Sequence, residues 1–433
     1  MHKQRFSLVF VILLVVVYAV IFYLQKGNSS PEVVEIYFAD RITAAHKELI
    51  DKYNEMKKGK VKVVTIDFPN VDFSTNERKE VLARSLRGTG DGIDLFAVDI
   101  VWVQRFAKWC EPLDKYFTDK EKKRILPQAI ASCYSQGELV AIPLDFVLGI
   151  MYYRDDLLKK LKNGNDIIKQ IQNGITWEDL IKLKSQLNVK NPFYIFPAAD
   201  YEGLICCYME MLLGLKGDYF RRYGFNFNKP EAAEALQMMV DFVNKFNMTP
   251  DEVTKLTEVP SYQYYIQNDG LFLHGWPSYD KDFKDSPVDS LKEKYLRKAP
   301  LPYFNNGKPA ATIGGWHLMI SKFSNKKKEV IDFVKFLLSD SSQEMFYRVS
   351  GYYPVINKFF EDSSYVKKYP EIVGMRKFIK YGVHRPSYEE YTRYSKILSF
   401  YVNQAIKKQI SVKDALAKTT SAIQLERTIV KDF

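Results

Sequence analysis

Apolar residues in the first hundred positions alternate between two periodicities. Short runs rich in Val, Ile and Phe predict three strands, over residues 33–38, 61–68 and 93–98. Apolar positions at helical spacing predict two intervening helices, over residues 44–56 and 76–87. Strands that alternate with helices of this length pair in parallel, so we predict an α/β fold. Ligands of such sheets bind beyond the carboxyl ends of the strands, which here means Asp40 and Asp99 to Trp102.

The pattern changes after residue 139. Residues 139–154 contain two apolar strands interrupted by Pro143, Leu144 and Asp145, which indicates a crossing from one lobe to another. Beyond this crossing the apolar spacing is mostly helical. Helix starts are marked by the N-cap residue Thr176, by Pro230 in a first turn, and by Ser411.

Residues 311–338 combine a turn, an aromatic ring and a helix. Gly314 and Gly315 allow a sharp turn and a close approach of the backbone to its neighbours. Trp316 stands at the start of a short apolar strand, 317–321, and the helix predicted over 326–338 follows. This arrangement suits recognition of a flat, partly apolar ligand. A hairpin turn with a core tryptophan is the alternative.

Length and charge narrow the class of protein. A chain of 433 residues predicts two or three domains, and 46% hydrophobic content excludes general disorder. The net charge of +11 is compatible with nucleic acid, but no zinc-ligand set, arginine-rich arm or RNA-binding aromatic motif accompanies it. Lysines are scattered over the predicted helices, so we expect a basic, solvated surface and no nucleic-acid partner.

The N-terminus predicts export. Residues 1–5 are basic, residues 6–24 are uncharged and close to the length that spans a bilayer, and 25–32 form a polar tether. We predict an uncleaved transmembrane anchor that holds the rest of the chain outside the cytoplasm; cleavage and secretion is the alternative. The first cysteine is Cys110, so no lipid-modified N-terminus is expected. Pairing of Cys110 with Cys133 stays open, and the cysteine spacing predicts no metal site.

Motifs for catalysis are missing from the sequence. It has no GxSxG, no HExxH and no phosphate-binding GxxxxGK[ST], so no enzyme and no cofactor are predicted. Carboxylates and aromatic rings instead recur at predicted strand-to-helix junctions. Carboxylates accept hydroxyl hydrogen bonds and aromatic faces cover the apolar side of a sugar ring. The candidates are Asp99, Trp102, Asp145, Tyr201, Glu202, Trp276 and Trp316. For each of them, a cap, a turn or a core position is the alternative.

Ordered blocks of sequence carry a family resemblance. They include GIDLFAVDIVWVQRFAKWCEPLD, ELVAIPLDFVLGIMYYRDDLL, FLHGWPSYDKDF, GYYPVINKFF and RPSYEEYTRYSKILSF. With them the chain resembles extracellular solute-binding proteins of the carbohydrate type, the maltose- and trehalose-binding relatives that serve ABC importers. The resemblance implies a two-lobe fold of the periplasmic-binding-protein type II, with a ligand cleft closed by a hinge. It also implies a carbohydrate ligand and a permease partner.

The resemblance further implies site residues and lobe boundaries. Gly314, Gly315 and Trp316 fall at the cleft edge, and Arg385 and Tyr388 in a late contact region of the second lobe. The implied lobes are 33–143 with 306–355, and 144–305 with 356–433. The first loop departs from the family pattern, so Asp40 and Arg41 are weaker candidates. A non-sugar ligand (a polyamine, glycerol phosphate or iron), a sensory subunit and a glycosidase remain alternatives.

Overall fold

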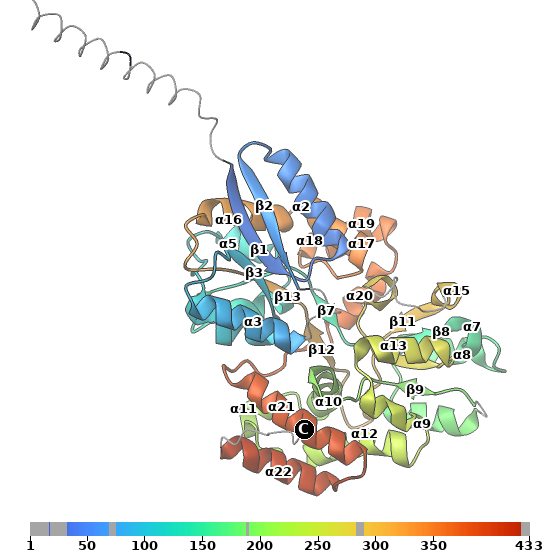
Figure 1. Cartoon of the computed structure of the whole chain (residues 1–433). Coiled ribbons are helices and arrows are strands. Elements are labelled where there is room, and N and C mark those ends of the chain that lie inside the picture. Colours follow the sequence, from blue (N-terminus) through green and yellow to red (C-terminus); the bar gives the residue numbers. More distant parts are fainter. Residues whose placement is uncertain (1–16, 18–32, 69–74, 188–189, 283–289, 426–433) are drawn as a thin grey trace, which may run out of the picture.

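The computed structural model describes residues 17, 33–68, 75–187, 190–282 and 290–425 (Figure 1). Two lobes make up this part of the chain, and strands cross between them near its centre. The predicted anchor over 6–24 lies, apart from Val17, outside the described residues. Among the residues that are described, no helix has the length and apolarity needed to span a membrane.

The first lobe is built on a five-stranded sheet of order β2-β1-β3-β13-β6. Its strands are β1 Val34–Asp40, β2 Val61–Asp67, β3 Leu95–Asp99, β6 Ile142–Pro143 and β13 Trp316–Ile320. Strand β1 pairs in parallel with β2 and β3, which confirms the predicted α/β arrangement. The late strand β13 enters antiparallel between β3 and β6. This insertion brings Trp316 directly opposite Asp99.

Amphipathic helices cover this sheet (Figure 1). The long ones are α2 Ala44–Met56, α3 Thr75–Arg87, α16 Lys327–Leu337 and α17 Asp340–Ser350. Helix α2 begins at Thr43, whose hydroxyl accepts the His46 backbone N–H. Its buried residue Tyr53 packs against Phe333 of α16, with ring centroids 4.8 Å apart. Short elements fill the connection to β6: η1 Ile100–Trp102, α4 Val103–Phe106, η2 Ala107–Trp109, α5 Asp119–Lys123, α6 Pro127–Ile130, η3 Ala131–Cys133, β4 Tyr134–Ser135 and β5 Glu138–Leu139.

The second lobe has a four-stranded sheet of order β11-β8-β10-β9. Its strands are β8 Ile150–Arg154, β9 Tyr194–Ile195, β10 Phe272–Gly275 and β11 Leu296–Ala299. Its principal helices are α8 Gly164–Asn173, α9 Trp177–Gln186, α10 Glu202–Leu215, α12 Pro230–Asn244, α13 Glu258–Gln267, α21 Tyr391–Ile406 and α22 Val412–Gln424. Shorter helices are α7 Asp155–Leu158, α11 Tyr219–Tyr223, η4 Asp251–Lys255, α14 Tyr279–Asp282 and α15 Ser290–Glu293. Helix α10 is buried over nearly its whole length, because α12, α21 and the crossing strand β12 pack around it.

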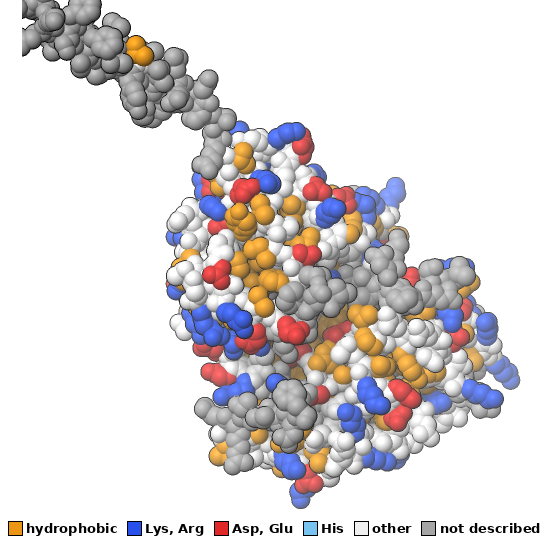
Figure 2. Space-filling model, viewed as in Figure 1, with side chains coloured by type: hydrophobic (Ala, Val, Ile, Leu, Met, Phe, Trp, Pro, Cys, Tyr) orange, Lys and Arg blue, Asp and Glu red, His pale blue; other side chains and the backbone are white. Residues whose placement is uncertain are grey.

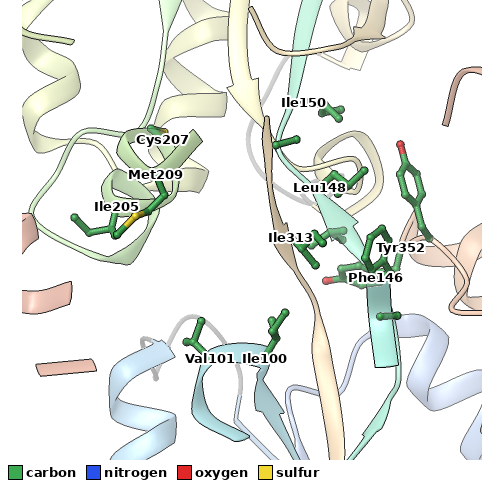
Figure 3. Close-up of a cluster of buried hydrophobic side chains, with 14 of the residues drawn as sticks. Ile100, Val101, Phe146, Leu148, Ile150, Ile205, Cys207, Met209, Ile313 and Tyr352 are labelled. Carbon is green, nitrogen blue, oxygen red and sulfur yellow. The ribbon is translucent and has the colours of Figure 1, made fainter. Parts of the chain in front are cut away.

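The chain crosses between the lobes through a small sheet of order β14-β12-β7. Its strands are β7 Val147–Leu148, β12 Ala311–Gly314 and β14 Gly382–Val383. The predicted crossing over 139–154 is confirmed, because β6 belongs to the first sheet and β8 to the second. Figure 3 shows apolar side chains of the crossing strands, such as Leu148 and Ile313, in one cluster with Ile205 of α10. This shared core holds the crossing in place.

Three short helices complete the chain between the crossing and α21. They are α18 Asn357–Glu361, α19 Ser363–Lys368 and α20 Ile372–Ile379. Helix α18 packs against α17 of the first lobe, where Phe359 meets Tyr347 at 5.1 Å between ring centroids. The segment after residue 356 therefore begins in contact with the first lobe.

The structure also shows the state of the cysteines and the distribution of surface charge. All four cysteines are buried and free, so Cys110 and Cys133 form no disulfide. Figure 2 shows basic and acidic side chains intermixed over the visible face, as the scattered lysines predict.

Candidate functional site

The Gly-Gly-Trp turn lies where the two lobes meet. Gly315 has a φ of +135°, a conformation that favours glycine. A Cβ atom at Gly315 would lie 2.6 Å from the carbonyl oxygen of Asp145, so the backbone approaches too closely for any other residue. The Asp145 carboxylate accepts the Trp316 backbone N–H at 3.1 Å. Asp145 is almost fully buried and holds this turn in shape.

Two tryptophans of the first lobe meet beside this turn. The rings of Trp102 and Trp316 are edge to face, with centroids 6.2 Å apart. The Arg78 guanidinium lies over the Trp316 ring at 4.1 Å, a cation–π contact. Trp102 is 4% exposed and partly a core residue, whereas Trp316 remains half-buried. Of the two rings, Trp316 is therefore the one with surface left for a ligand.

Arg78 belongs to a buried ionic cluster at the end of β1. It pairs with Asp40 at 2.6 Å, and the opposite Asp40 oxygen is 3.3 Å from Nε2 of His46. Burial alone raises the pKa of Asp40, but His46 and Arg78 outweigh it, so this pKa lies below its usual value. Asp40 thus positions Arg78, which sequence reasoning missed because no local motif marks it.

Arg385 bridges the two lobes. Its guanidinium donates to Oδ1 of Asp99 at 3.2 Å, at the end of β3, and to Oε1 of Glu202 at 2.7 Å, at the start of α10. Burial by itself lowers the pKa of Arg385. The surrounding acidic groups, Asp99 and Glu202 among them, raise the pKa by more than burial lowers it, so the side chain stays charged. Asp99 also caps η1 by accepting the Val101 backbone N–H at 3.0 Å.

A polar stripe on α21 supports Glu202 from the far side. Tyr391 donates its hydroxyl to Oε1 of Glu202 at 2.7 Å, and Ser395 donates to Oε2 at 2.5 Å. One turn further, Ser399 donates to Asp200 at 2.6 Å. These three residues recur every fourth position, on one face of α21. That spacing was the available sequence signal for Tyr391 and Ser395, which sequence reasoning did not single out.

The other predicted residues divide into half-buried positions beside the glycine turn and positions that support it. Trp276 follows β10 and is half-buried, and its ring would lie 3.4 Å from a Cβ atom on Gly314, so it faces the glycine turn. Tyr201 folds back over Gly203; burial and then Glu258 raise the pKa of its hydroxyl. The ring is half-buried, but its hydroxyl is buried against α10, so Tyr201 supports the start of that helix.

Tyr388 lies at the rim of the site. It is 45% exposed, and its ring stands edge-on to Phe225 at 5.3 Å. The next residue, Glu389, pairs with Lys108 of the first lobe at 2.5 Å. The 385–391 segment therefore touches both lobes at two points, through Arg385 and through Glu389.

The charged side chains of this arrangement are paired with one another. Asp40 contacts Arg78, while Asp99 and Glu202 share Arg385, so carboxylates outnumber arginines by one. Aromatic rings lie beside these pairs on both lobes, at Trp316 and at Trp276. Paired charges with spare donors and acceptors, next to half-buried rings, suit a neutral ligand with many hydroxyls.

Residues 39–344 match the family described as bacterial extracellular solute-binding protein. A probable ABC transporter-binding protein of Deinococcus radiodurans is 26% identical, over 80% of this chain and 83% of that protein.

Solved structures share the fold. A maltose-bound T. maritima MalE3 structure has 26% identity and a TM-score of 0.79, covering 91% of this chain and all of that one. A Thermotoga lettingae ABC transporter solute-binding protein bound with α-D-tagatose has 19% identity and a TM-score of 0.76, covering 91% and 99%. These structures confirm the predicted two-lobe fold. With more than half of its length matched, the chain belongs to the bacterial extracellular solute-binding protein family.

Proposed function

We propose that this solute-binding protein takes up a neutral sugar or oligosaccharide in the cleft between its lobes and delivers it to an ABC permease. One observation carries the proposal: carboxylates from both lobes meet at Arg385, and half-buried rings at Trp316 and Trp276 flank the glycine turn where the lobes join. Stacking on Trp316 and Trp276 would cover the apolar face of a sugar, and Asp99 and Glu202 would accept its hydroxyls. The sugar-bound relatives support this ligand class.

We assign the ligand contacts to the cleft residues and the remaining predicted residues to their support. Asp99, Glu202, Trp276, Trp316, Arg385 and Tyr388 form the contact set, with Trp102 behind Trp316. Gly314, Gly315, Asp145 and Tyr201 shape the backbone around them. No catalytic step is assigned to any of these side chains, so we expect binding without turnover.

Lobe boundaries and membrane attachment belong to the same proposal. We place β6 and β13 in the first lobe, as predicted, and let the first lobe continue through α20 because α18 packs on α17. The second lobe would then resume at β14 and the 385–391 segment. The family is extracellular, and residues 6–24 would hold this chain at the outer face of the membrane.

A melting-temperature screen tests the ligand class. Maltose, trehalose, longer α-glucans and tagatose are compared with spermidine, glycerol 3-phosphate and ferric citrate. A ligand that binds the native state raises the melting temperature. Only sugars should raise it, and affinity at about micromolar strength corresponds to roughly −8 kcal/mol. A shift with a charged solute alone would contradict the proposal.

Matched variants then locate the site by titration calorimetry. W316A and W276A should each weaken sugar binding at least tenfold, about 1.4 kcal/mol. F323A is the control, because Phe323 is an exposed ring beyond the opposite end of β13. Unchanged affinity in both tryptophan variants would place the sugar elsewhere. Release of reducing ends during long incubation would make the protein a glycosidase.

A further inference from the structure

A second cluster of polar side chains is buried inside the second lobe, behind Trp276, whose ring centroid lies 6.3 Å from that of His274. Cys207 and Glu210 lie one turn apart on α10, and His274 faces them from β10. One ligand atom from each of the three lies within 4.8 Å of the other two. All three side chains are at least 90% buried.

The hydrogen bonds within this cluster leave one ring nitrogen of His274 without a partner. Glu210 Oε2 lies 2.8 Å from His274 Nε2, and Glu210 Oε1 accepts the Thr312 backbone N–H at 3.0 Å. Among the described residues, none forms a hydrogen bond with His274 Nδ1, although this atom is buried. A buried nitrogen without a partner is costly, by about 1–3 kcal/mol.

A small cavity adjoins the same three side chains. Its volume is about 10 Å³, close to that of a single water or ion. Cys207, Glu210 and His274 line it together with the thioether residues Met211 and Met239. Sulfur and imidazole donors are soft or borderline ligands, which favour zinc or a related transition metal over magnesium or calcium.

We propose that Cys207, Glu210 and His274 form a zinc site. A thiolate, a carboxylate and an imidazole are all zinc ligands, and the two anionic groups balance the charge of the ion. Binding releases the Cys207 thiol proton; the hydrogen bond between Glu210 and Nε2 of His274 gives way to bonds from both atoms to the ion, and the imidazole carries its proton on Nδ1. The Glu210–His274 distance has to widen from 2.8 Å to about 3.3 Å, the separation of two ligands on a tetrahedral ion.

The position of the site gives zinc a structural role. Glu210 also holds Thr312 of the crossing strand β12, and the Thr312 hydroxyl donates to the Cys206 carbonyl oxygen at 3.1 Å. An ion at this point joins α10, β10 and β12. It therefore stiffens the second lobe where the chain crosses to the first.

Metal content of the purified full chain tests the proposal. The protein is unfolded in urea with a chelator, refolded with excess zinc, desalted and measured by elemental mass spectrometry. This route gives the ion access to a sealed site. Wild type should retain one zinc per chain. The control C206S should retain the same amount, because Cys206 is an equally buried neighbour outside the cluster.

Variants and cobalt define the ligands. C207S and E210Q should lose the bound zinc, and cobalt in place of zinc should give thiolate-to-metal absorption in wild type and C206S but not in C207S. Circular dichroism verifies that each variant is folded. Zinc retained by C207S, or wild type refolded without stoichiometric zinc, would overturn the proposal.

Discussion

Helix α10 carries two carboxylates in opposite situations. Glu202 stands at its first position, 25% exposed, and its partners are side chains of Arg385, Tyr391 and Ser395. Glu210, about two turns later, is 6% exposed and is held by His274 and by the Thr312 backbone N–H. Glu202 is therefore linked to the first lobe, because its partner Arg385 also contacts Asp99. The partners of Glu210 belong to strands packed around the same helix.

The difference indicates that α10 contributes to ligand binding at its first turn and to the stability of the second lobe further along. The Arg385 bridge at Glu202 includes a first-lobe group, Asp99, which moves away if the lobes separate. The Glu210 contacts involve the sheet strand β10 and the crossing strand β12, and both strands contribute to the buried apolar core. Figure 3 shows Ile313 of β12 in that core. We therefore expect changes at Glu202 to alter binding and changes at Glu210 to alter stability.

The largest expected effect is on folding. E210A leaves His274 and the Thr312 N–H buried without a partner, so the free energy of unfolding should fall by about 3–5 kcal/mol. Urea denaturation in the presence of a chelator measures this without a contribution from metal. E202A is the matched control, with a smaller loss because Glu202 is partly exposed. A larger loss of stability in E202A than in E210A would contradict the assignment of stability to Glu210 and of binding to Glu202.

His317 is a second buried histidine, and its partner is a hydroxyl group instead of a carboxylate. It shows how burial by itself affects the pH dependence of stability. Nε2 of His317 lies 2.7 Å from the Ser132 hydroxyl, and burial lowers the pKa of His317 to about 4. The unfolded chain takes up this proton near pH 6.5 and the folded chain only near pH 4. Stability should therefore fall by about 3 kcal/mol as pH drops from 6.5 to 4.

The H317Q variant isolates that contribution in urea denaturation at several pH values. It should lose this part of the acid dependence while wild type retains it. Parallel pH profiles of wild type and H317Q would contradict the assignment to His317.

The variant R385M tests the role of the Arg385 bridge between Asp99 and Glu202. Without the guanidinium, Asp99 and Glu202 lose their common partner, so the open form should become more populated. Sugar affinity should weaken about tenfold, roughly 1.4 kcal/mol. X-ray scattering of the ligand-free protein should show a larger radius of gyration than wild type. R376M, an exposed arginine on α20, should leave both measurements unchanged.

The smallest effect is expected at the rim. Y388A removes a ring that is 45% exposed, so the free energy of unfolding should change by no more than about 0.5 kcal/mol. Sugar affinity should weaken only two- to threefold, measured by calorimetry. Y388F keeps the ring and should bind as wild type does. A loss as large as that of W316A would move the centre of the site toward Tyr388.

Much of the fold was predictable from the chain alone. Helix α2 was predicted at its observed bounds, and the first strands were displaced by only one or two residues. The insertion of β13 between β3 and β6 was not predicted, because the pairing of strands more than 150 residues apart leaves no local pattern. Among the site residues, the glycine turn was predictable from backbone chemistry. Arg78 was not, because its role depends on Asp40 and Trp316, which are distant in sequence.

The sequence by itself determined the alternation of strands and helices, the crossing near Pro143 and the resemblance to solute-binding proteins. Local periodicity, caps and turn residues are short-range properties, so one chain suffices to read them. Tertiary structure decided which charges meet. It joined Asp99 to Glu202 through Arg385, and it placed His274 beside Cys207 and Glu210 from 64 residues away. Burial and distance set the energies of these groups, and both arise only when remote segments pack together.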